Sequence, residues 1–323
     1  MNQMQALAYS SGLSAFRAHL HAVSKRALSQ NHRNQIKHAL VAARQRWPRL
    51  YTCLHGRFTA TELSDELSRR ISHDFEILMV HSSYDRLLPM CSAKPHQVVE
   101  ALLKLCGKNR TLAMPAFTLG GRLYDVAEFY RNRAFNVNRT PSEMGLLTEV
   151  FRRWPGVKRS LHPTHSICAF GPLAEQLTAT HHLAATRTGK GTPFDLMAQK
   201  QTVILGLGVE YYRCLTQTHT AEDLLGERFP AKFKKEMVSI NTVDCRGNNS
   251  NYLLAKLHPT TPVNVAIVRS LLAQDELREW RFKGVSLFAT SAGLVTERLL
   301  QAAEKGITIY GKTPVSNSFH LSR

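Results

Sequence analysis

The sequence contains no apolar run that is long enough to cross a membrane. Hydrophobic residues make up 43% of the 323 residues, which is enough for a full core, but the longest apolar runs are strand-length pieces such as residues 77–80. A membrane-spanning helix needs about 18–20 apolar residues. Residues 1–5 also lack the basic patch of a secretory signal, and no apolar core or cleavage site follows them. We therefore expect a cytoplasmic protein.

The sequence also lacks paired cysteines and any residue set with the spacing of a metal site. Six cysteines are scattered without a Cys-x-x-Cys pair, at Cys53, Cys91, Cys106, Cys168, Cys214 and Cys245. This pattern favours reduced, mostly buried thiols over disulfides or a zinc site. His162 and His165 stand close together, but no third ligand accompanies them, and zinc normally needs three or four protein ligands. We therefore expect no metal.

Acidic residues are missing from the first 60 positions. The chain has 42 Lys and Arg against 24 Asp and Glu, a formal net charge of +18, and nine of the basic residues lie in residues 1–60. Half of the excess charge therefore lies on a fifth of the chain. Apolar residues recur at helical steps over residues 13–28, which predicts an amphipathic basic helix, and a second helix is expected over residues 34–46. The segment either binds an anionic surface, such as a membrane or nucleic acid, or is a solvated extension that aids docking or solubility.

The rest of the chain alternates between strand-like and helix-like patterns. Thr59 and Glu62 have the spacing of a capping box, which predicts the start of a helix. Strands are expected over residues 76–81, 111–117, 166–169 and 203–207, and helices over residues 96–106, 142–153 and 172–178. This alternation is typical of α/β proteins with a largely parallel central sheet.

After Pro230 the pattern changes to that of a hairpin. Residues 236–244 and 249–256 suit two strands, and Gly247 between them suits a tight turn. A helix over residues 263–273, a strand over 285–290 and a helix over 293–304 follow. We therefore expect an α/β fold with a C-terminal hairpin, divided into a basic, helical extension (1–60), one large domain (61–311) and a tail (312–323).

Short motifs follow one another in order along the large domain. They are Val80-His81-Ser82-Ser83, Thr140-Pro141-Ser142-Glu143-Met144-Gly145, the run from Arg159 to Gly171, Gly189-Lys190-Gly191-Thr192-Pro193, residues 203–208 and the run from Leu215 to Asp223. In this order the sequence from about residue 61 to about residue 311 resembles the aminoglycoside 3-N-acetyltransferase family. The resemblance implies an α/β/α sandwich that transfers an acetyl group from acetyl-coenzyme A to an amino group on a sugar-like ring, without a metal.

His219 lies where members of this family carry their catalytic histidine. An ammonium ion has no lone pair, so acetyl transfer needs a base near neutrality, and histidine has a reference pKa of about 6.5. Glu222, three residues later on a predicted helix, can reach the ring, fix its tautomer and favour the imidazolium. An isolated histidine would more simply be a core or surface residue, but the motifs around His219 favour direct transfer with His219 as general base.

The first histidine-containing motif offers further residues for the site. Pro163 stiffens the loop between Ser160 and Ser166, and this loop could hold an imidazole or the Ser160 hydroxyl against the donor or acceptor. The family usually keeps the position of His162 and varies that of His165. We therefore expect Ser160 to contact the cosubstrate and His162 to line the acceptor site, and we assign His165 no role.

The sequence contains no Walker-type loop, and residues 206–208 lack the third glycine of a dinucleotide fingerprint. Two other segments are candidates for contacts with the phosphates of coenzyme A: His81, Ser82 and Ser83 at a strand-to-helix junction, and Gly189, Lys190, Gly191 and Thr192 in a glycine-rich loop. Free backbone N–H groups suit anions at such a junction. Alternatively, Ser82 and Ser83 are ordinary helix caps.

Glu143 and Thr216 are candidates on the acceptor side. Glu143 either faces the acceptor amine or stands in the first turn of a helix, where an acidic residue favours the dipole, and the second interpretation is the simpler one. Thr216 belongs to the same motif as His219.

The charge of the chain bears on the acceptor. Residues 61–323 still carry a net charge of +9, which disfavours long-range attraction of a polycation. We therefore rank a phosphate- or nucleotide-linked amino sugar of surface polysaccharide synthesis first and an aminoglycoside, with antibiotic resistance as the role, second. A third interpretation is a non-catalytic protein on the same scaffold that binds nucleic acid or a membrane surface.

Overall fold

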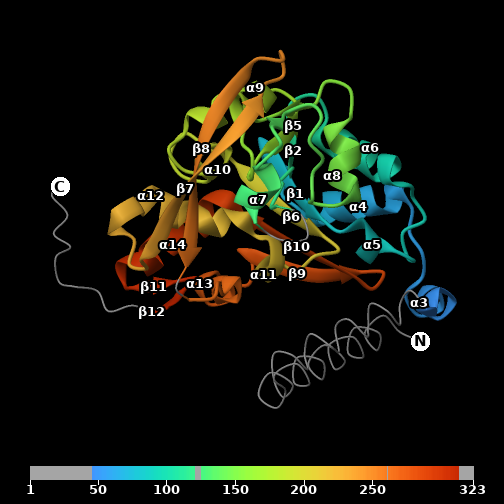
Figure 1. The fold of residues 1–323 in the computed structure, drawn as a ribbon. Helices are drawn as coiled ribbons and strands as arrows, with labels where there is room; N and C mark the ends of the chain where they lie inside the picture. The colour runs from blue at the N-terminus through green and yellow to red at the C-terminus, as the bar shows by residue number, and fades with distance from the viewer. Residues whose placement is uncertain (1–45, 121–124, 260, 313–323) are drawn as a thin grey trace. The chain divides into compact units, whose positions relative to one another are not determined.

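The computed structural model describes residues 46–120, 125–259 and 261–312 (Figure 1). The chain divides into two compact units between Leu54 and His55. The predictions for residues 1–45 and for a tail after residue 312 lie outside the described residues. In the part that the structure describes, no helix is long and apolar enough to span a bilayer.

The amino-terminal end of the second unit combines a capping box with a buried aromatic ring. Helix α4 (Ala60–Arg70) begins as predicted, because Thr59 Oγ1 accepts from Glu62 N at 3.2 Å and Thr59 N donates to Glu62 Oε2 at 2.8 Å. Phe58, however, is only 1% exposed, and its ring lies 5.1 Å from that of Phe282. Phe58, which precedes the predicted boundary after residue 60, therefore packs within the second unit.

Seven strands form the central sheet, in the order β4-β5-β2-β1-β6-β10-β9. Their bounds in that order are Lys158–Arg159, Ile167–Phe170, Thr111–Pro115, Ile77–Ser82, Thr202–Leu207, Val285–Ser291 and Leu277–Phe282. β1 pairs in parallel with β2 and β6, and the other neighbouring pairs are antiparallel. Five of the seven strands therefore run in one direction and only β5 and β10 run against them, which confirms the predicted largely parallel sheet.

Helices cover both faces of this sheet, as the predicted α/β/α sandwich requires. α4 packs with α6 (Pro95–Cys106) and α8 (Leu146–Arg152) on one face, while α9 (Ala174–Thr178), α10 (Pro193–Gln199) and α14 (Ala292–Glu304) lie on the other (Figure 1). Because side chains alternate along a strand, Ile77 and Met79 of β1 point into the second layer, where they share a core with Met197 and Val295. Strand β1 is buried along almost its whole length.

The predicted hairpin is present and belongs to a second sheet, with order β3-β7-β8. β7 (Phe233–Val243) and β8 (Asn249–Pro259) form a long ribbon, and β3 (Phe135–Asn136) adds to its edge. The turn is stable because the Asp244 carboxylate accepts from the N–H groups of Arg246 and Asn248, both at 2.8 Å, and Gly247 adopts a φ of 90°.

Smaller elements connect these layers. The helices are α3 (Pro48–His55), α5 (Tyr84–Leu87), α7 (Val126–Tyr130), α11 (Tyr211–Cys214), α12 (Thr220–Leu225) and α13 (Val268–Leu271). The 3-10 turns are η2 (His181–Leu183), η3 (Thr216–His219), η4 (Gly226–Arg228) and η5 (Val265–Ile267), and a short strand pair is formed by β11 (Ile307–Thr308) and β12 (Gly311–Lys312).

Two helices are shorter than the sequence-based expectation, and one strand of the central sheet was missed. The helix predicted over residues 142–153 begins only at Leu146, because Gly145 has a φ of 97° that no helix accommodates. The helix predicted over residues 263–273 is η5 followed by the single turn of α13. Strand β9 was missed because edge strands carry charged residues that hide the strand pattern, here Arg278, Glu279 and Arg281.

Candidate active site

The candidate site lies beyond the carboxyl ends of the parallel strands. β1 ends at Ser82 and β6 ends at Leu207, and since the two strands run in parallel register their ends share one edge of the sheet. After β6 the chain turns through α11 and η3 into α12. Gln217 fixes η3, because its buried side-chain amide donates to Phe194 O at 3.0 Å and to Thr296 Oγ1 at 2.9 Å. This arrangement places His219 between η3 and α12.

His219 and Glu222 form the contact that their spacing predicted. His219 is the last residue of η3 and the N-cap of α12, and Glu222 lies in the first turn of α12. The distance from His219 Nδ1 to Glu222 Oε1 is 3.0 Å. The imidazole is 22% exposed and the carboxylate only 1%, so the ring can meet a ligand while its partner stays inside the protein.

Two further donors hold the Glu222 carboxylate. Arg187 Nη2 donates to Oε1 at 2.7 Å, and the Tyr310 hydroxyl donates to Oε2 at 2.6 Å. Burial alone would raise the pKa of Glu222, but the hydrogen bonds and charges of His219, Arg187 and Tyr310 outweigh it and hold the pKa below its ordinary value.

The ionised carboxylate fixes the tautomer of the catalytic candidate. A carboxylate can only accept hydrogen bonds, so His219 Nδ1 carries the proton. The lone pair of the neutral imidazole is then on Nε2. This nitrogen is the one that can remove a proton from an incoming amine.

The loop before α10 is built against α12. The Asp223 carboxylate accepts from Thr188 N at 2.8 Å and from Thr188 Oγ1 at 2.6 Å. A Cβ on Gly189 would lie 2.4 Å from Thr186 Oγ1 and 2.9 Å from Asp223 Cβ, so only glycine fits there. Glu222 and Asp223 thus anchor the loop through Arg187 and Thr188 respectively.

Three backbone amides of this loop, which was predicted to contact the phosphates of coenzyme A, make hydrogen bonds within the protein. Gly189 N donates to Thr186 Oγ1, Gly191 N donates to the Asp195 carboxylate, and Thr192 N donates to Gly189 O. These three amides therefore already have partners, and the loop also caps α10, where the Thr192 side chain accepts from Asp195 N. Lys190 is exposed and carries a positive charge in this loop.

Ser160 lies inside the protein, in a chain of hydrogen bonds with His181. Its hydroxyl is 2.9 Å from His181 Nδ1 and accepts from Ile167 N at 2.9 Å, while His181 Nε2 is 3.0 Å from Arg187 O. A carbonyl only accepts, so His181 carries its proton on Nε2 and the Ser160 hydroxyl donates to Nδ1. Burial lowers the pKa of His181 to about 4. Ser160 therefore supports the loop that carries Arg187.

The two histidines of the first motif lie differently from the expectation. His162 is fully buried, its Nδ1 accepts from His165 N at 3.0 Å, and its ring packs 5.0 Å from that of Tyr252. His165 is partly exposed, and its ring lies 4.9 Å from that of Phe117. Burial and the charges of Arg187 and His219 hold the pKa of His165 well below its usual range. The charge of His219 therefore acts on His165, a residue to which no role was assigned.

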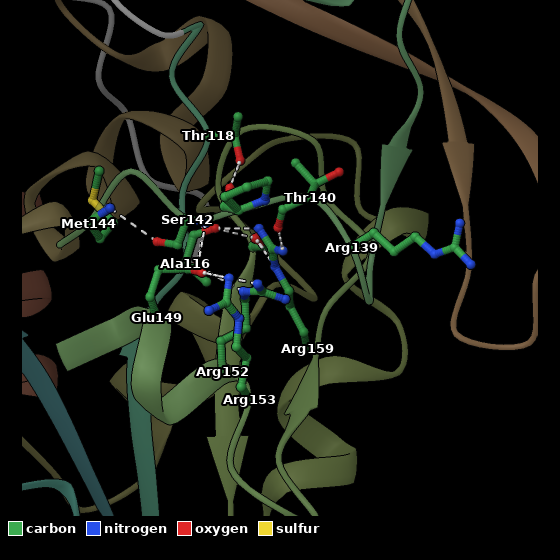
Figure 2. A network of polar contacts seen from close by, with 12 residues as sticks. Ala116, Thr118, Arg139, Thr140, Ser142, Met144, Glu149, Arg152, Arg153 and Arg159 are labelled. Atoms are coloured by element: carbon green, nitrogen blue, oxygen red, sulfur yellow. Dashed lines mark hydrogen bonds and ion pairs between the residues drawn. The ribbon is translucent and has the colours of Figure 1, made fainter. Parts of the chain in front are cut away.

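A buried arginine ties together the loops behind these histidines. Arg159 Nε donates to Ser166 Oγ at 3.0 Å and Nη2 donates to Ala116 O at 2.7 Å, while Nη1 donates to Thr140 O. Burial lowers the pKa of Arg159 to about 10, so it stays charged at neutral pH. Figure 2 shows that Arg159 reaches into the network, whereas Arg139 points away from it.

Glu143 lies in a loop and does not open a helix. Its carboxylate is exposed and accepts from Leu119 N at 2.9 Å. The next acidic residue, Glu149 of α8, accepts from Ser142 N at 2.6 Å and pairs with Arg152 at 2.8 Å. The interpretation of Glu143 as a first-turn residue is therefore wrong.

The remaining predicted residues lie at the same edge of the sheet. His81 is 5% exposed, and burial lowers its pKa to about 4. Ser82 and Ser83 are partly exposed, and Ser83 precedes α5 without a side-chain capping bond. Thr216 is partly exposed and donates to Cys214 O at 3.3 Å. Across residues 46–120, 125–259 and 261–312, no group of three or more His, Cys, Asp or Glu is placed to hold a metal ion.

The sequence reasoning missed Arg187, His181 and Tyr310. His181 lies in η2, Arg187 lies in the irregular segment after it, and Tyr310 lies near the end of the described chain. Tyr310 packs its ring 5.0 Å from that of Phe233. No spacing rule connects these residues to Glu222, because they meet it only through the fold.

Residues 79–299 match the sequence pattern of the aminoglycoside 3-N-acetyltransferase family. The aminoglycoside N(3)-acetyltransferase III of Acinetobacter baumannii is 31% identical over 179 residues, which is 52% of this chain and 60% of the relative. The aminoglycoside N(3)-acetyltransferase IV of Salmonella sp is 30% identical over 152 residues, which is 45% of this chain and 51% of the relative. The matched segments thus span little more than half of these relatives.

Solved structures share the fold. A structure described as AAC-IIIb binary with CoASH superposes with a TM-score of 0.65 at 23% identity, covering 80% of this chain and 99% of the other. A structure described as AAC-VIa bound to sisomicin gives a TM-score of 0.62 at 19% identity, covering 76% and 97%. The α/β/α architecture is therefore that of these proteins.

The buried carboxylate generates a prediction about stability. Replacing Glu222 by Gln should lower the free energy of unfolding by about 3 kcal/mol at neutral pH, because breaking a buried ion pair leaves the other charge unpaired. Since the folded state holds the pKa of Glu222 below 4.5, its stabilisation is present above pH 4.5 and is lost as the pH falls through the lower folded-state pKa. Urea unfolding across this pH range measures the effect.

Glu100→Gln is the matched control. Glu100 pairs with Lys104 at 3.0 Å on the surface of α6, where both side chains are exposed, and such pairs contribute about 0–1 kcal/mol. The role given to the buried charge would be contradicted if Glu222→Gln and Glu100→Gln lowered the free energy of unfolding equally. It would also be contradicted if the loss for Glu222→Gln persisted at acidic pH.

Proposed function

The chain belongs to the aminoglycoside 3-N-acetyltransferase family, and on that basis we propose that it transfers an acetyl group from acetyl-coenzyme A to an amino group of an aminoglycoside. The observation that carries this proposal is the ordered pair of His219 and Glu222 at the carboxyl edge of the sheet. The pair lies within the segment that matches the family. It supplies a base whose proton-accepting nitrogen is defined by a buried partner.

Membership of this family changes the ranking of the two classes of acceptor. The positive net charge favoured a phosphate- or nucleotide-linked amino sugar, but the relatives are named for aminoglycosides. Net charge acts at long range and is screened by salt beyond about 10 Å, whereas an acceptor amine is recognised by nearby groups. The exposed Glu143 carboxylate is such a group, because Glu143 N donates to Phe117 O and the Phe117 ring lies against His165. We therefore place the aminoglycoside first.

We assign the acetyl donor to the same carboxyl edge of the sheet as His219. A structural neighbour is described as a binary complex with CoASH, which supports acetyl-coenzyme A as the cosubstrate. Ser82 and Ser83 are partly exposed where β1 ends, and Lys190 is exposed in the loop anchored to α12. These three side chains are the proposed contacts for the phosphates and the pantetheine arm, while Gly189, Gly191 and Thr192 shape the loop.

The proposed reaction is a direct transfer. His219 Nε2 removes one proton from the acceptor ammonium and passes it to water. It then takes the second proton from the nitrogen as the neutral amine forms a bond to the thioester carbonyl carbon. The carbon–sulfur bond breaks and the thiolate of coenzyme A leaves, taking up the proton from His219. Glu222 stabilises the imidazolium in between, since it accepts from Nδ1 throughout.

The arrangement of charges keeps this base active. Arg187 holds one oxygen of Glu222 and Tyr310 holds the other, so the carboxylate cannot rotate away from the ring. His181 Nε2 donates to the backbone carbonyl of Arg187 at 3.0 Å. The position of the His219 ring is therefore set by residues that do not themselves meet the acceptor.

An acceptor assay tests the proposed reaction. The full chain with acetyl-coenzyme A should release free thiol when sisomicin is added, and mass spectrometry should find one added acetyl group on the antibiotic, because the site is proposed to neutralise and acetylate an amine. A nucleotide-linked amino sugar serves as the competing acceptor. A higher kcat/KM for the nucleotide-linked amino sugar would make that class the preferred acceptor. If no thiol is released with either acceptor, the proposal is contradicted.

Replacing His219 by Ala tests the base. The rate of transfer should fall by about 10²–10⁴-fold at neutral pH, which is typical for loss of a general base, and the deficit should shrink at alkaline pH, where more of the amine is already neutral. His182→Ala is the control, because His182 is the neighbour of His181 on η2 and its Nδ1 has no hydrogen-bond partner among the described residues. A deficit that stays constant through alkaline pH would assign His219 a positioning role instead.

A further inference from the structure

A basic cleft lies beside the edge strand β9, away from the catalytic residues. Its volume is about 740 Å³, which is within the range of about 300–1,000 Å³ for small-molecule sites. The cleft is lined by Arg69, Arg70, Arg269, Gln274, Leu277, Arg278, Glu279 and Trp280. None of these residues belongs to the site around His219, so the cleft has no part in the proposed reaction.

The lining carries an excess of positive charge. Four arginines and one glutamate line the cleft, which gives a formal charge of +3. Glu66 of α4 reduces this to +2, because its carboxylate pairs with both Arg69 and Arg70 at 3.1 Å. The side chains of Arg69 and Arg70 remain 70% and 57% exposed, so their guanidinium groups are open to a ligand.

The other two arginines approach the cleft from different elements. Arg269 of α13 is fixed, because its guanidinium donates to Leu272 O at 2.9 Å and to the carbonyls of Ala273 and Leu277. Those carbonyls orient the group without neutralising its charge. Arg278 is exposed on β9, two residues from Trp280, so its side chain lies on the same face of the strand as the indole.

We propose that this cleft binds a phosphorylated small molecule with a planar base, of the class of the nucleoside monophosphates. A phosphate monoester carries a charge of about −1.5 to −2 at pH 7, which balances the charge of the lining. Guanidinium groups bind phosphate oxygens through paired N–H donors. The indole of Trp280 supplies an aromatic surface on which a base can stack.

The position of the cleft makes this site independent of the acetyl donor. The proposed donor contacts lie where β1 ends and in the loop before α10, whereas the cleft is formed by the end of α4, the region of α13 and the start of β9. A ligand in the cleft therefore need not compete with coenzyme A. The same cleft can be occupied while the proposed reaction proceeds.

Isothermal titration of the full chain with AMP tests the proposal, with adenosine as the probe that lacks the phosphate. AMP should bind and adenosine should not, and Arg278→Ala or Arg70→Ala should each weaken AMP binding by about 10-fold, the value typical of losing a charged hydrogen bond. Arg246→Ala, which removes an exposed arginine from the hairpin turn, is the matched control and should leave binding unchanged. Saturating coenzyme A should also leave it unchanged.

Several results would overturn the proposal. They are the absence of AMP binding, equal binding of AMP and adenosine, and AMP binding that coenzyme A abolishes while Arg278→Ala leaves it intact. The last result would place AMP in the donor site. If Trp280→Leu weakens the binding of AMP but leaves the binding of inorganic pyrophosphate unchanged, stacking of the base on Trp280 is supported. Both arginines that are replaced lie on the surface, and circular dichroism of the variants checks that the fold is kept.

Discussion

A carboxylate as deeply buried as that of Glu222 is stable in its ionised form only where donors surround it, because burial disfavours the charged state. Here the donors come from the imidazole of His219, the guanidinium of Arg187 and the hydroxyl of Tyr310. Each of them depends on the same carboxylate for its own partner. The proton on His219 Nδ1, the free lone pair on Nε2 and hence the proposed chemistry all follow from this one buried charge.

The network also explains how distant segments form one site. Glu222 joins α12 to the loop before α10 and to the segment between β11 and β12. His181 and Ser160 extend the same chain of hydrogen bonds to the loop that carries His162 and His165. A second buried charge, Arg159, holds that loop by donating to the backbone carbonyls of Ala116 and Thr140. Two buried charges of opposite sign therefore position the loops of the site on the sheet.

The sequence was sufficient for whatever depends on short spacings. The capping box at Thr59, the hairpin turn at Gly247 and the contact between His219 and Glu222 all join residues at most a few positions apart, and the structure contains each of them. Arg187 and Tyr310 lie 35 and 88 residues from Glu222, so only the folded chain brings them together. In the glycine-rich loop, Gly191 N donates to the Asp195 carboxylate of α10, a use that the sequence of the loop does not distinguish from binding a phosphate.

The tautomer of His219 tests the central claim most directly. In a long-range proton–nitrogen NMR spectrum of protein labelled with nitrogen-15 histidine, the His219 signal, assigned by its loss in His219→Gln, should show the proton on Nδ1 and a bare Nε2. His181 should show the opposite tautomer, with the proton on Nε2, because it donates to Arg187 O. A proton on His219 Nε2 at neutral pH, with Nδ1 bare, would contradict the account, since Glu222 would then not hold the ring and the base would have no lone pair for the amine.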